Sequence, residues 1–445
     1  MLDYDLFKQY KEDVLKDPKR YIKEYNNVKQ RVNYSPAIYK GQPVKFLYQP
    51  FFFSDQDIQR FKALVTTLET ILQKVIQQYL SDPSFRKPFG FSNFLEELIL
   101  AEPGYKHPFP MARFDIFYHQ NGSFQFCELN ADGSSGMVES RELDQIIYNS
   151  LALDRYKEEY DFHTFELFDS WIDELIKNYQ EFTGSQKFPQ VGIVDFFEGK
   201  PPSEFMEFQK AFQKRGYSTV VADARELELK GEHLYYKDFR IDCIYRRAVT
   251  RDVEVHQGEV QDFIEAYLQG KVCVVGSFRS QIIHNKIIFS VLHDDKVADF
   301  LTAKERQFIK DHIPYTVPFS SKEPRLLEMI LEDKDRYVLK PSDKYACMGV
   351  SVGRDYLSEQ WRRFAEEELD EEYLIQEYCN VPAMDMGIFS EDNVHFEKCN
   401  YITGLYVYNG KFQGIYHRAG RENIIGSLVE GFTIPNYLVR KKNNK

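Results

Sequence analysis

The chain of 445 residues is long for one domain, and we expect two or three subdomains around a common cleft. Hydrophobic residues at 43% and charged residues at 28% are ordinary for a globular protein, and a formal net charge of −12 argues against a general nucleic-acid binder. Six scattered cysteines without zinc spacing, no signal-peptide pattern and no membrane-length apolar run favour a soluble, cytoplasmic protein that does not bind membranes.

The first hundred residues or so are predicted to be helical and irregular. The segment Ser54-Asp55-Gln56-Asp57 resembles a capping box that opens a helix. Apolar residues then recur at helical spacing, namely Ile58, Phe61, Leu64, Val65, Leu68, Leu72, Val75, Ile76 and Tyr79. Such a stripe is typical of core packing, and nothing in this region suggests chemistry.

A β-hairpin is predicted next. Residues 112–117 and 124–133 alternate apolar and polar side chains, which is the period of a half-buried strand. The segment between them contains Asn121-Gly122, the strongest short hairpin signal. The register of the two strands decides which side chains share a face.

Four polar side chains give this hairpin a candidate chemistry. Arg113 and Asp115 project from one face of the first strand, and Glu128 and Asn130 project from one face of the second. If the two faces coincide, two carboxylates and an amide oxygen suit Mg²⁺, and the arginine can neutralise charge on a transferred phosphoryl group. The plain alternative is an exposed hairpin with ordinary strand-face charges.

A turn of glycine and serine, Gly133 to Gly136, leaves the second strand. Its backbone N–H groups and the hydroxyls of Ser134 and Ser135 can hold an anion or a substrate, or the segment is a plain turn. A helix over residues 139–151 follows.

Residues 188–275 alternate strands and helices. Strands are predicted over 191–195, 217–222 and 239–245, and a helix over 204–215. This rhythm indicates a small parallel α/β unit, and the first turn is not a dinucleotide-binding glycine motif.

The third of these strands delivers polar residues to its carboxyl end, where ligands of open α/β sheets bind. They are Arg246, Arg247 and Thr250. The alternative is a pair of exposed loop arginines.

The last third of the chain carries several short motifs. We expect strands over 271–276, 337–341, 350–352, 373–378 and 423–425, a helix over 280–292 with Asn285 and Lys286, and a second Asn-Gly hairpin over 404–418. Lys340 closes a strand before a polar loop that ends at Gly349, so it is a candidate phosphate ligand, although no Walker A motif is present.

Together these pieces resemble the ATP-grasp ligases, specifically the circularly permuted group that contains glutathionylspermidine synthase. The matching motifs run in family order from about residue 110 to about 430. They are Arg113-x-Asp115, Glu128-x-Asn130-Ala131-Asp132, Asn285-Lys286, Lys340-Pro341, Gly349, Gln376-Glu377-Tyr378 and Gly414-Ile415-x-x-Arg418. The family continues Thr-Pro-Thr where this chain has Gly133-Ser134-Ser135, so nucleotide chemistry carries over better than glutathione or spermidine specificity.

The resemblance implies an α/β (α+β) chain with a circularly permuted ATP-grasp fold, in which the first hairpin packs into the same sheet as the C-terminal strands. It divides the chain into four parts. They are an N-terminal helical region (1–100), a metal-binding hairpin of the ATP-grasp core (101–150), a pre-ATP-grasp-like α/β domain (151–275) and the ATP-grasp nucleotide-binding domain (276–445).

The resemblance also implies residue roles. Asp115, Glu128 and Asn130 hold Mg²⁺ against the phosphates of ATP, and Arg113 is the catalytic residue on the transferred γ-phosphoryl group. The expected ATP contacts are Arg113, Lys286, Lys340, Gly349, Gln376, Glu377, Tyr378 and Ile425, the last of which is otherwise core. The candidate substrate contacts are Ser134, Ser135, Arg247, Thr250 and Arg418.

This resemblance predicts an ATP-dependent carboxylate–amine ligase with ATP and Mg²⁺ as cofactors. It would join a small-molecule acid to a small-molecule amine through an acyl phosphate; the identities of the acid and the amine are left open. Two alternatives are a non-catalytic ATP-binding regulatory or scaffold protein and a kinase that stops at phosphoryl transfer. The complete set of Arg113, Asp115, Glu128 and Asn130 argues against a scaffold.

Overall fold

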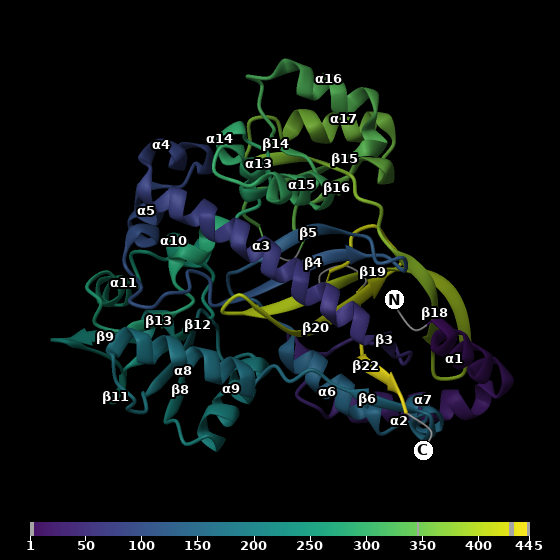
Figure 1. Cartoon of the computed structure of the whole chain (residues 1–445). Coiled ribbons are helices and arrows are strands. Elements are labelled where there is room, and N and C mark those ends of the chain that lie inside the picture. Colours follow the sequence, from purple (N-terminus) through teal and green to yellow (C-terminus); the bar gives the residue numbers. More distant parts are fainter. Residues whose placement is uncertain (1–3, 345–346, 427–430, 443–445) are drawn as a thin grey trace.

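A six-stranded antiparallel sheet, the core sheet, lies at the centre of the computed structural model, which describes residues 4–344, 347–426 and 431–442 (Figure 1). Its order is β21-β20-β19-β4-β5, and β18 also pairs with β19. The strands are β4 (Met111–Tyr118), β5 (Phe124–Asn130), β18 (Ala383–Phe389), β19 (Val394–Tyr408), β20 (Lys411–Gly420) and β21 (Phe432–Ile434). The predicted first hairpin therefore does share a sheet with the C-terminal strands.

The register of β4 and β5 brings the four candidate side chains to one face. Arg113 lies opposite Asn130, and Asp115 lies opposite Glu128. Residues directly opposite each other on antiparallel strands project from the same face of the sheet. The pairing shifts between Asp115 and Ile116, immediately beyond the two carboxylates.

The long helix α3 (Asp55–Ser81) crosses in front of the core sheet in Figure 1 and packs against β20. Its N-terminus is the predicted capping box, because the Ser54 side chain accepts from the backbone of Asp57 and the Asp57 carboxylate accepts from the backbone of Ser54. Every residue of the predicted apolar stripe is buried. Both predictions for this helix are confirmed.

The two ends of the chain meet in a three-stranded sheet of order β3-β22-β6. It consists of β3 (Phe51–Phe53), β22 (Asn436–Lys441) and β6 (Tyr160–His163). Around it and α3 lie α1 (Tyr4–Lys16), α2 (Pro18–Asn33), β1 (Ile38–Tyr39), β2 (Gln42–Pro43), α4 (Pro83–Arg86), α5 (Asn93–Leu100), α6 (Met137–Tyr148) and α7 (Leu151–Asp154). The expected helix over 139–151 is thus α6, which ends at Tyr148.

The predicted parallel α/β unit is present at the lower left of Figure 1. Its sheet has the order β13-β12-β7-β8, with β7 (Val191–Asp195), β8 (Thr219–Asp223), β12 (Cys243–Arg246) and β13 (Cys273–Val275) all parallel. Its helices are α8 (Asp169–Thr183), α9 (Ser203–Lys214), α10 (Thr250–Val255) and α11 (Gln261–Leu268).

The single strand predicted over 239–245 is wrong, because these residues form two strands in different sheets. It is divided at Asp242 between β12 and a separate meander of β9 (Leu227–Lys230), β10 (His233–Tyr236) and β11 (Phe239–Ile241). The Asp242 carboxylate accepts from the backbone of Gln190, which fixes the change of sheet. Apolar residues flank Asp242 on both sides, so the alternation alone gave no sign of the break.

The predicted helix over 280–292 is also interrupted. It consists of α12 (Gln281–His284) and α13 (Ile287–Leu292), with Asn285 in extended backbone at ψ 130° between them. The Asn285 side chain accepts from the backbone N–H of Ile287 at 3.0 Å and so gives the first N–H group of α13 a partner. The backbone N–H of Lys286 donates to the carbonyl of Ser342 at 2.9 Å instead of continuing a helix.

A four-stranded antiparallel sheet with two helices forms a separate layer at the top of Figure 1, which we call the upper lobe. Its order is β14-β17-β15-β16, with β14 (Thr316–Pro318), β15 (Tyr337–Pro341), β16 (Ser351–Val352), β17 (Tyr373–Glu377), α16 (Pro324–Glu332) and α17 (Ser358–Glu367). The helices α14 (Asp295–Ala298) and α15 (Ala303–His312) lie before it in the chain.

The strands predicted over 337–341, 350–352 and 373–378 are confirmed within one or two residues. The strand predicted over 423–425 is wrong, because these residues have no regular structure. No helix in the described part of the chain is long and apolar enough to cross a membrane.

Candidate nucleotide and metal site

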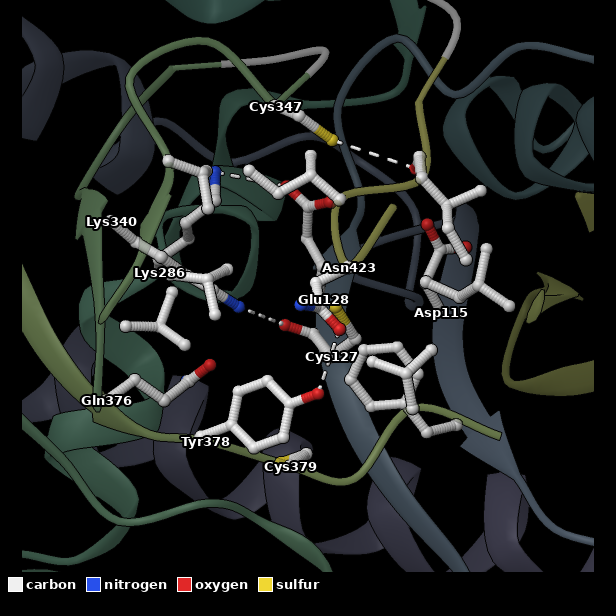
Figure 2. Close-up of a pocket in the computed structure, with 18 of the residues that line it drawn as sticks. Asp115, Cys127, Glu128, Lys286, Lys340, Cys347, Gln376, Tyr378, Cys379 and Asn423 are labelled. Atoms are coloured by element: carbon white, nitrogen blue, oxygen red, sulfur yellow. Dashed lines mark hydrogen bonds and ion pairs between the residues drawn. The ribbon is translucent and has the colours of Figure 1, made fainter. Parts of the chain in front are cut away.

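A pocket lies between the core sheet and the upper lobe (Figure 2). The core sheet contributes Asp115, Glu128 and Arg418, whereas the upper lobe contributes Lys340 and the end of β17. The predicted metal and ATP contacts that line it are Asp115, Glu128, Lys286, Lys340, Gln376, Glu377, Tyr378 and Ile425. Residues separated by some three hundred positions in the sequence are therefore brought together around one cavity.

Glu128 is paired with Lys286. The lysine Nζ lies 3.0 Å from a carboxylate oxygen of Glu128 and donates to the carbonyl of Lys344 at 2.7 Å. Burial acts to raise the pKa of Glu128, but Lys286, with smaller contributions from Lys340 and His284, lowers it to about 2. Glu128 is thus a carboxylate at neutral pH, and it forms one wall of the pocket.

Asp115 is held by two guanidinium groups. Arg113 donates to both of its carboxylate oxygens at 2.8 and 3.1 Å, and Arg418 donates to one of them at 2.7 Å. The side-chain amide of Asn130 donates to the same carboxylate at 3.2 Å. Asp115 is almost fully buried, so these partners replace the water that its charge has lost.

The two arginines differ in what they face. Arg418 lines the pocket beside Asp115, whereas Arg113 lies behind Asp115 and is not among the lining residues. The remaining nitrogen of Arg113 donates to the carbonyl of Ser135 at 2.8 Å. The catalytic role of Arg113 therefore stays a prediction, and Arg418 is the one of the two arginines that lines the pocket.

The metal donors that the sequence predicts are few but of the right kind. In the described residues no cluster of three or more His, Cys, Asp and Glu side chains can hold a metal ion. Asp115 and Glu128 nevertheless lie opposite each other and line the pocket, whereas Asn130 does not line it and turns its amide nitrogen toward Asp115. Since Mg²⁺ commonly takes one or two carboxylates and completes its shell with substrate phosphates and water, the two carboxylates fit a Mg²⁺ shared with a nucleotide.

Part of the pocket wall is apolar, as is common in small-molecule sites. Its walls include Val338, Val352 and Ile425, and Figure 2 shows Tyr378 beside Gln376 at the end of β17. The Tyr378 hydroxyl donates to the side chain of Asn423 at 3.1 Å, which ties the strand end to the irregular segment that supplies Ile425.

Gly349, a predicted ATP contact, does not line the pocket. Its φ is +74°, and a Cβ atom there would lie 2.6 Å from the Tyr373 hydroxyl, so the backbone requires glycine. Tyr345 and Ala346 of the same predicted loop lie outside the described residues.

The turn predicted to hold a substrate anion instead holds a carboxylate of the protein. Glu204, from α9, accepts from the backbone N–H groups of Gly136, Met137 and Val138 at 3.0, 2.8 and 3.3 Å. It also pairs with Arg247 at 2.8 Å, and both side chains are nearly buried. The turn thus binds an anionic group as expected, but that group is Glu204, which ties α9 of the parallel unit to the turn between β5 and α6.

The other candidate substrate contacts lie in the same junction. Ser134 donates through its hydroxyl to the carbonyl of Asn130, and its own carbonyl accepts from Arg247. Thr250 is buried, and its backbone N–H donates to the carboxylate of Asp132 at 2.6 Å. The same carboxylate pairs with Arg246 at 2.7 Å. Ser135 is exposed, and only Arg418 faces a pocket large enough for a substrate. Glu204 was missed because no short motif marks it.

Comparison with known proteins found both a similar sequence and similar solved structures. No family model matches the chain. An ATP-grasp enzyme, ankG of Aspergillus thermomutatus, is 27% identical over 157 residues, which cover 33% of this chain and 32% of that protein. The match therefore spans about a third of the relative's length.

Two solved structures are also similar. A glutathione synthetase-like effector of Globodera pallida has a TM-score of 0.57 at 12% identity, with 95% of this chain and 98% of that chain covered. A putative γ-glutamylcysteine synthetase of Methylobacillus flagellatus has a TM-score of 0.40 at 11% identity, covering 81% and 83%.

The Glu204 contact makes a stability prediction. Glu204→Ala leaves Arg247 buried without its carboxylate partner, and breaking a buried ion pair in this way costs about 3–5 kcal/mol. The free energy of unfolding, measured by denaturant titration, should fall by that order. The control Glu198→Ala removes a carboxylate that is 91% exposed and pairs with Arg225 at 3.1 Å, so its effect should stay below about 1 kcal/mol. Equal losses in the two variants would contradict a docking role for Glu204.

Proposed function

Because this chain has an ATP-grasp fold, we propose that it is an ATP-dependent carboxylate–amine ligase. It forms an amide bond through an acyl phosphate and releases ADP and phosphate. The observation that supports the proposal best is the meeting of Asp115, Glu128, Lys286, Lys340 and Arg418 around one pocket with a partly apolar wall. A similar ATP-grasp enzyme and a glutathione synthetase-like structure add to that support.

ATP enters this scheme with its adenine against the apolar part of the wall and its phosphates toward the core sheet. Lys340 projects from the end of β15 and donates to the carbonyl of Cys127 at 3.3 Å, and Lys286 pairs with Glu128. A phosphate offers each lysine a stronger charge-assisted partner than these. Both lysines then bind the nucleotide, and Glu128 is released from its ion pair.

Asp115, Glu128 and Asn130 are the residues that would hold Mg²⁺. When bound, the ion supplies neutralisation of phosphate charge during transfer. Arg418 takes the phosphoryl oxygens on the pocket side of Asp115. Arg113 is a positioning residue in this scheme, since its two contacts with Asp115 hold that carboxylate in place; the direct phosphoryl contact that the sequence predicts for Arg113 is the alternative.

The chemistry proceeds in two balanced steps. A carboxylate oxygen of the acid attacks the γ-phosphorus of ATP, the bond to the β–γ bridging oxygen breaks, and ADP leaves. The nitrogen of a neutral amine then attacks the acyl carbon, phosphate leaves with the bonding electrons, and the amine proton passes to solvent or phosphate. Since an acyl phosphate is hydrolysed by water, a closed pocket between two lobes favours the amide product.

The decisive experiment measures ADP release from full-length protein with Mg²⁺-ATP and panels of carboxylic acids and amines. A ligase requires both an acid and an amine for sustained release. Release with an acid alone would indicate a kinase. Tight ATP binding without stimulated release would indicate a non-catalytic ATP-binding regulatory or scaffold protein.

The metal assignment predicts the behaviour of Glu128→Gln. The amide cannot supply the charge that Mg²⁺ requires, so Mg²⁺-dependent ADP release should be lost, while the melting temperature stays near that of the wild type. Glu391→Gln, at an exposed position, is the control and should retain full activity. Wild-type release by Glu128→Gln would remove the metal role, and a variant that unfolds would indicate that Glu128 is only structural.

The nucleotide assignment predicts the behaviour of Lys340→Ala. Loss of a charge-assisted contact with a phosphate should weaken ATP binding by about 1.5–3 kcal/mol. Isothermal titration calorimetry with a non-hydrolysable ATP analogue measures this directly, with Lys304→Ala as the exposed control. Unchanged affinity would mean that Lys340 is an ordinary lysine at a strand end.

A further inference from the structure

A second pocket adjoins the nucleotide pocket, and we infer that it receives the acid substrate and that this acid carries a second anionic group. The inference rests on the proposed function and assigns the substrate class of the same site. We call this cavity the acceptor pocket. Its walls come from the β1–β2 hairpin, the first turn of α6, and β20, and the residues that matter are Lys40, Lys45, Glu139, Tyr416 and Arg418.

Arg418 is shared between the two pockets. It lines the acceptor pocket and also the nucleotide pocket, where it lies 2.7 Å from Asp115. A carboxylate that enters from the acceptor pocket therefore meets a guanidinium on the same side as the proposed phosphate site. Because phosphoryl transfer requires the attacking oxygen to lie close to the γ-phosphorus, the reacting carboxylate belongs at this shared wall.

The outer wall is held in place by backbone pairing. Ile38 pairs with Pro43 across the β1–β2 hairpin. The carbonyl of Lys45 accepts from the N–H of Thr433 at 2.9 Å, and the N–H of Leu47 donates to the carbonyl of Thr433 at 3.0 Å. The segment that follows the hairpin is thus attached to Thr433 of β21, which anchors the backbone of Lys45 to the core sheet that carries Arg418.

The charge of the acceptor pocket favours an anion. Lys40 and Lys45 are exposed at its rim, and across residues 4–344, 347–426 and 431–442 neither forms an ion pair. The carboxylate among its described lining residues is that of Glu139, which is 8% exposed and accepts from the Tyr416 hydroxyl. Burial raises the pKa of Glu139, against the opposing effect of the Tyr416 hydrogen bond.

This balance assigns the acid, rather than the amine, to the acceptor pocket. A protonated amine would face both lysines and Arg418, which already pairs with Asp115, and among the described lining residues the carboxyl group that could offset these cations is that of Glu139. An acid with one carboxylate satisfies Arg418 alone and leaves the two lysines without a partner. A second carboxylate or phosphate on the same molecule supplies that partner, and charge-assisted contacts of this kind are among the strongest hydrogen bonds in proteins.

The test uses full-length protein saturated with Mg²⁺ and a non-hydrolysable ATP analogue. Calorimetry compares pentanoate with glutarate, and hexanoate with adipate, so that each pair differs only in the second carboxylate. Lys40→Gln/Lys45→Gln is the pocket variant, and Lys304→Gln/Lys310→Gln, two exposed positions on α15, is the charge-matched control.

We expect the wild type and the control to bind each dicarboxylate at least about tenfold more tightly than its monocarboxylate, and the pocket variant to lose this preference. Retention of the preference in the pocket variant, or equal binding of both acids by the wild type, would overturn the inference. If no acid binds while the ATP analogue does, the acceptor assignment falls and the nucleotide site stands. If lysine-dependent dicarboxylate binding occurs without binding of the ATP analogue, the proposed function falls and the anion pocket stands.

Discussion

The placement of Asp115 opposite Glu128 on neighbouring strands is the constraint on which the rest of the site depends. Two carboxylates on one sheet face repel each other, and Asp115 is buried as well. The fold offsets this with three cations, since Arg113 on the same strand and Arg418 and Lys286 from distant parts of the chain each contact one of the two carboxylates. The pair thus draws β20 and the start of α13 to the same face, where we propose that a nucleotide and its metal ion bind.

The interruption between α12 and α13 follows from the same requirement. In a continuous helix the Lys286 backbone would bond within the helix, and its side chain would take its direction from the helix surface. The break at Asn285 instead turns the Lys286 backbone to Ser342 and its side chain to Glu128 and Lys344. One residue therefore links the core sheet to the segment that follows β15, which suits a site that must bring two lobes to one ligand.

The sequence was sufficient for features that depend on neighbours in the chain. Alternation and an Asn-Gly turn gave the first hairpin, a capping box and a 3.6-residue stripe gave α3, and the resemblance placed the hairpin among the C-terminal strands. Features set by distant partners could not be predicted from the sequence. The change of sheet at Asp242 depends on a hydrogen bond from Gln190, and the anion that the glycine–serine turn binds is the carboxylate of Glu204. The circular permutation itself stays a prediction, because fold similarity at 12% identity does not test the order of the motifs.

The two sides of the proposed reaction are built in different ways, and this explains why only one of them was visible in the sequence. The nucleotide side uses short motifs at strand ends, so its lysines and carboxylates can be recognised one motif at a time. The acceptor pocket joins the β1–β2 hairpin, which lies outside the region of resemblance, to α6 and β20. Its character arises from burial of Glu139 against Tyr416 and from two lysines without ion-pair partners in the described chain, and neither property has a local pattern. Substrate choice in such a protein can therefore change through the N-terminal hairpin while the nucleotide site keeps its residues.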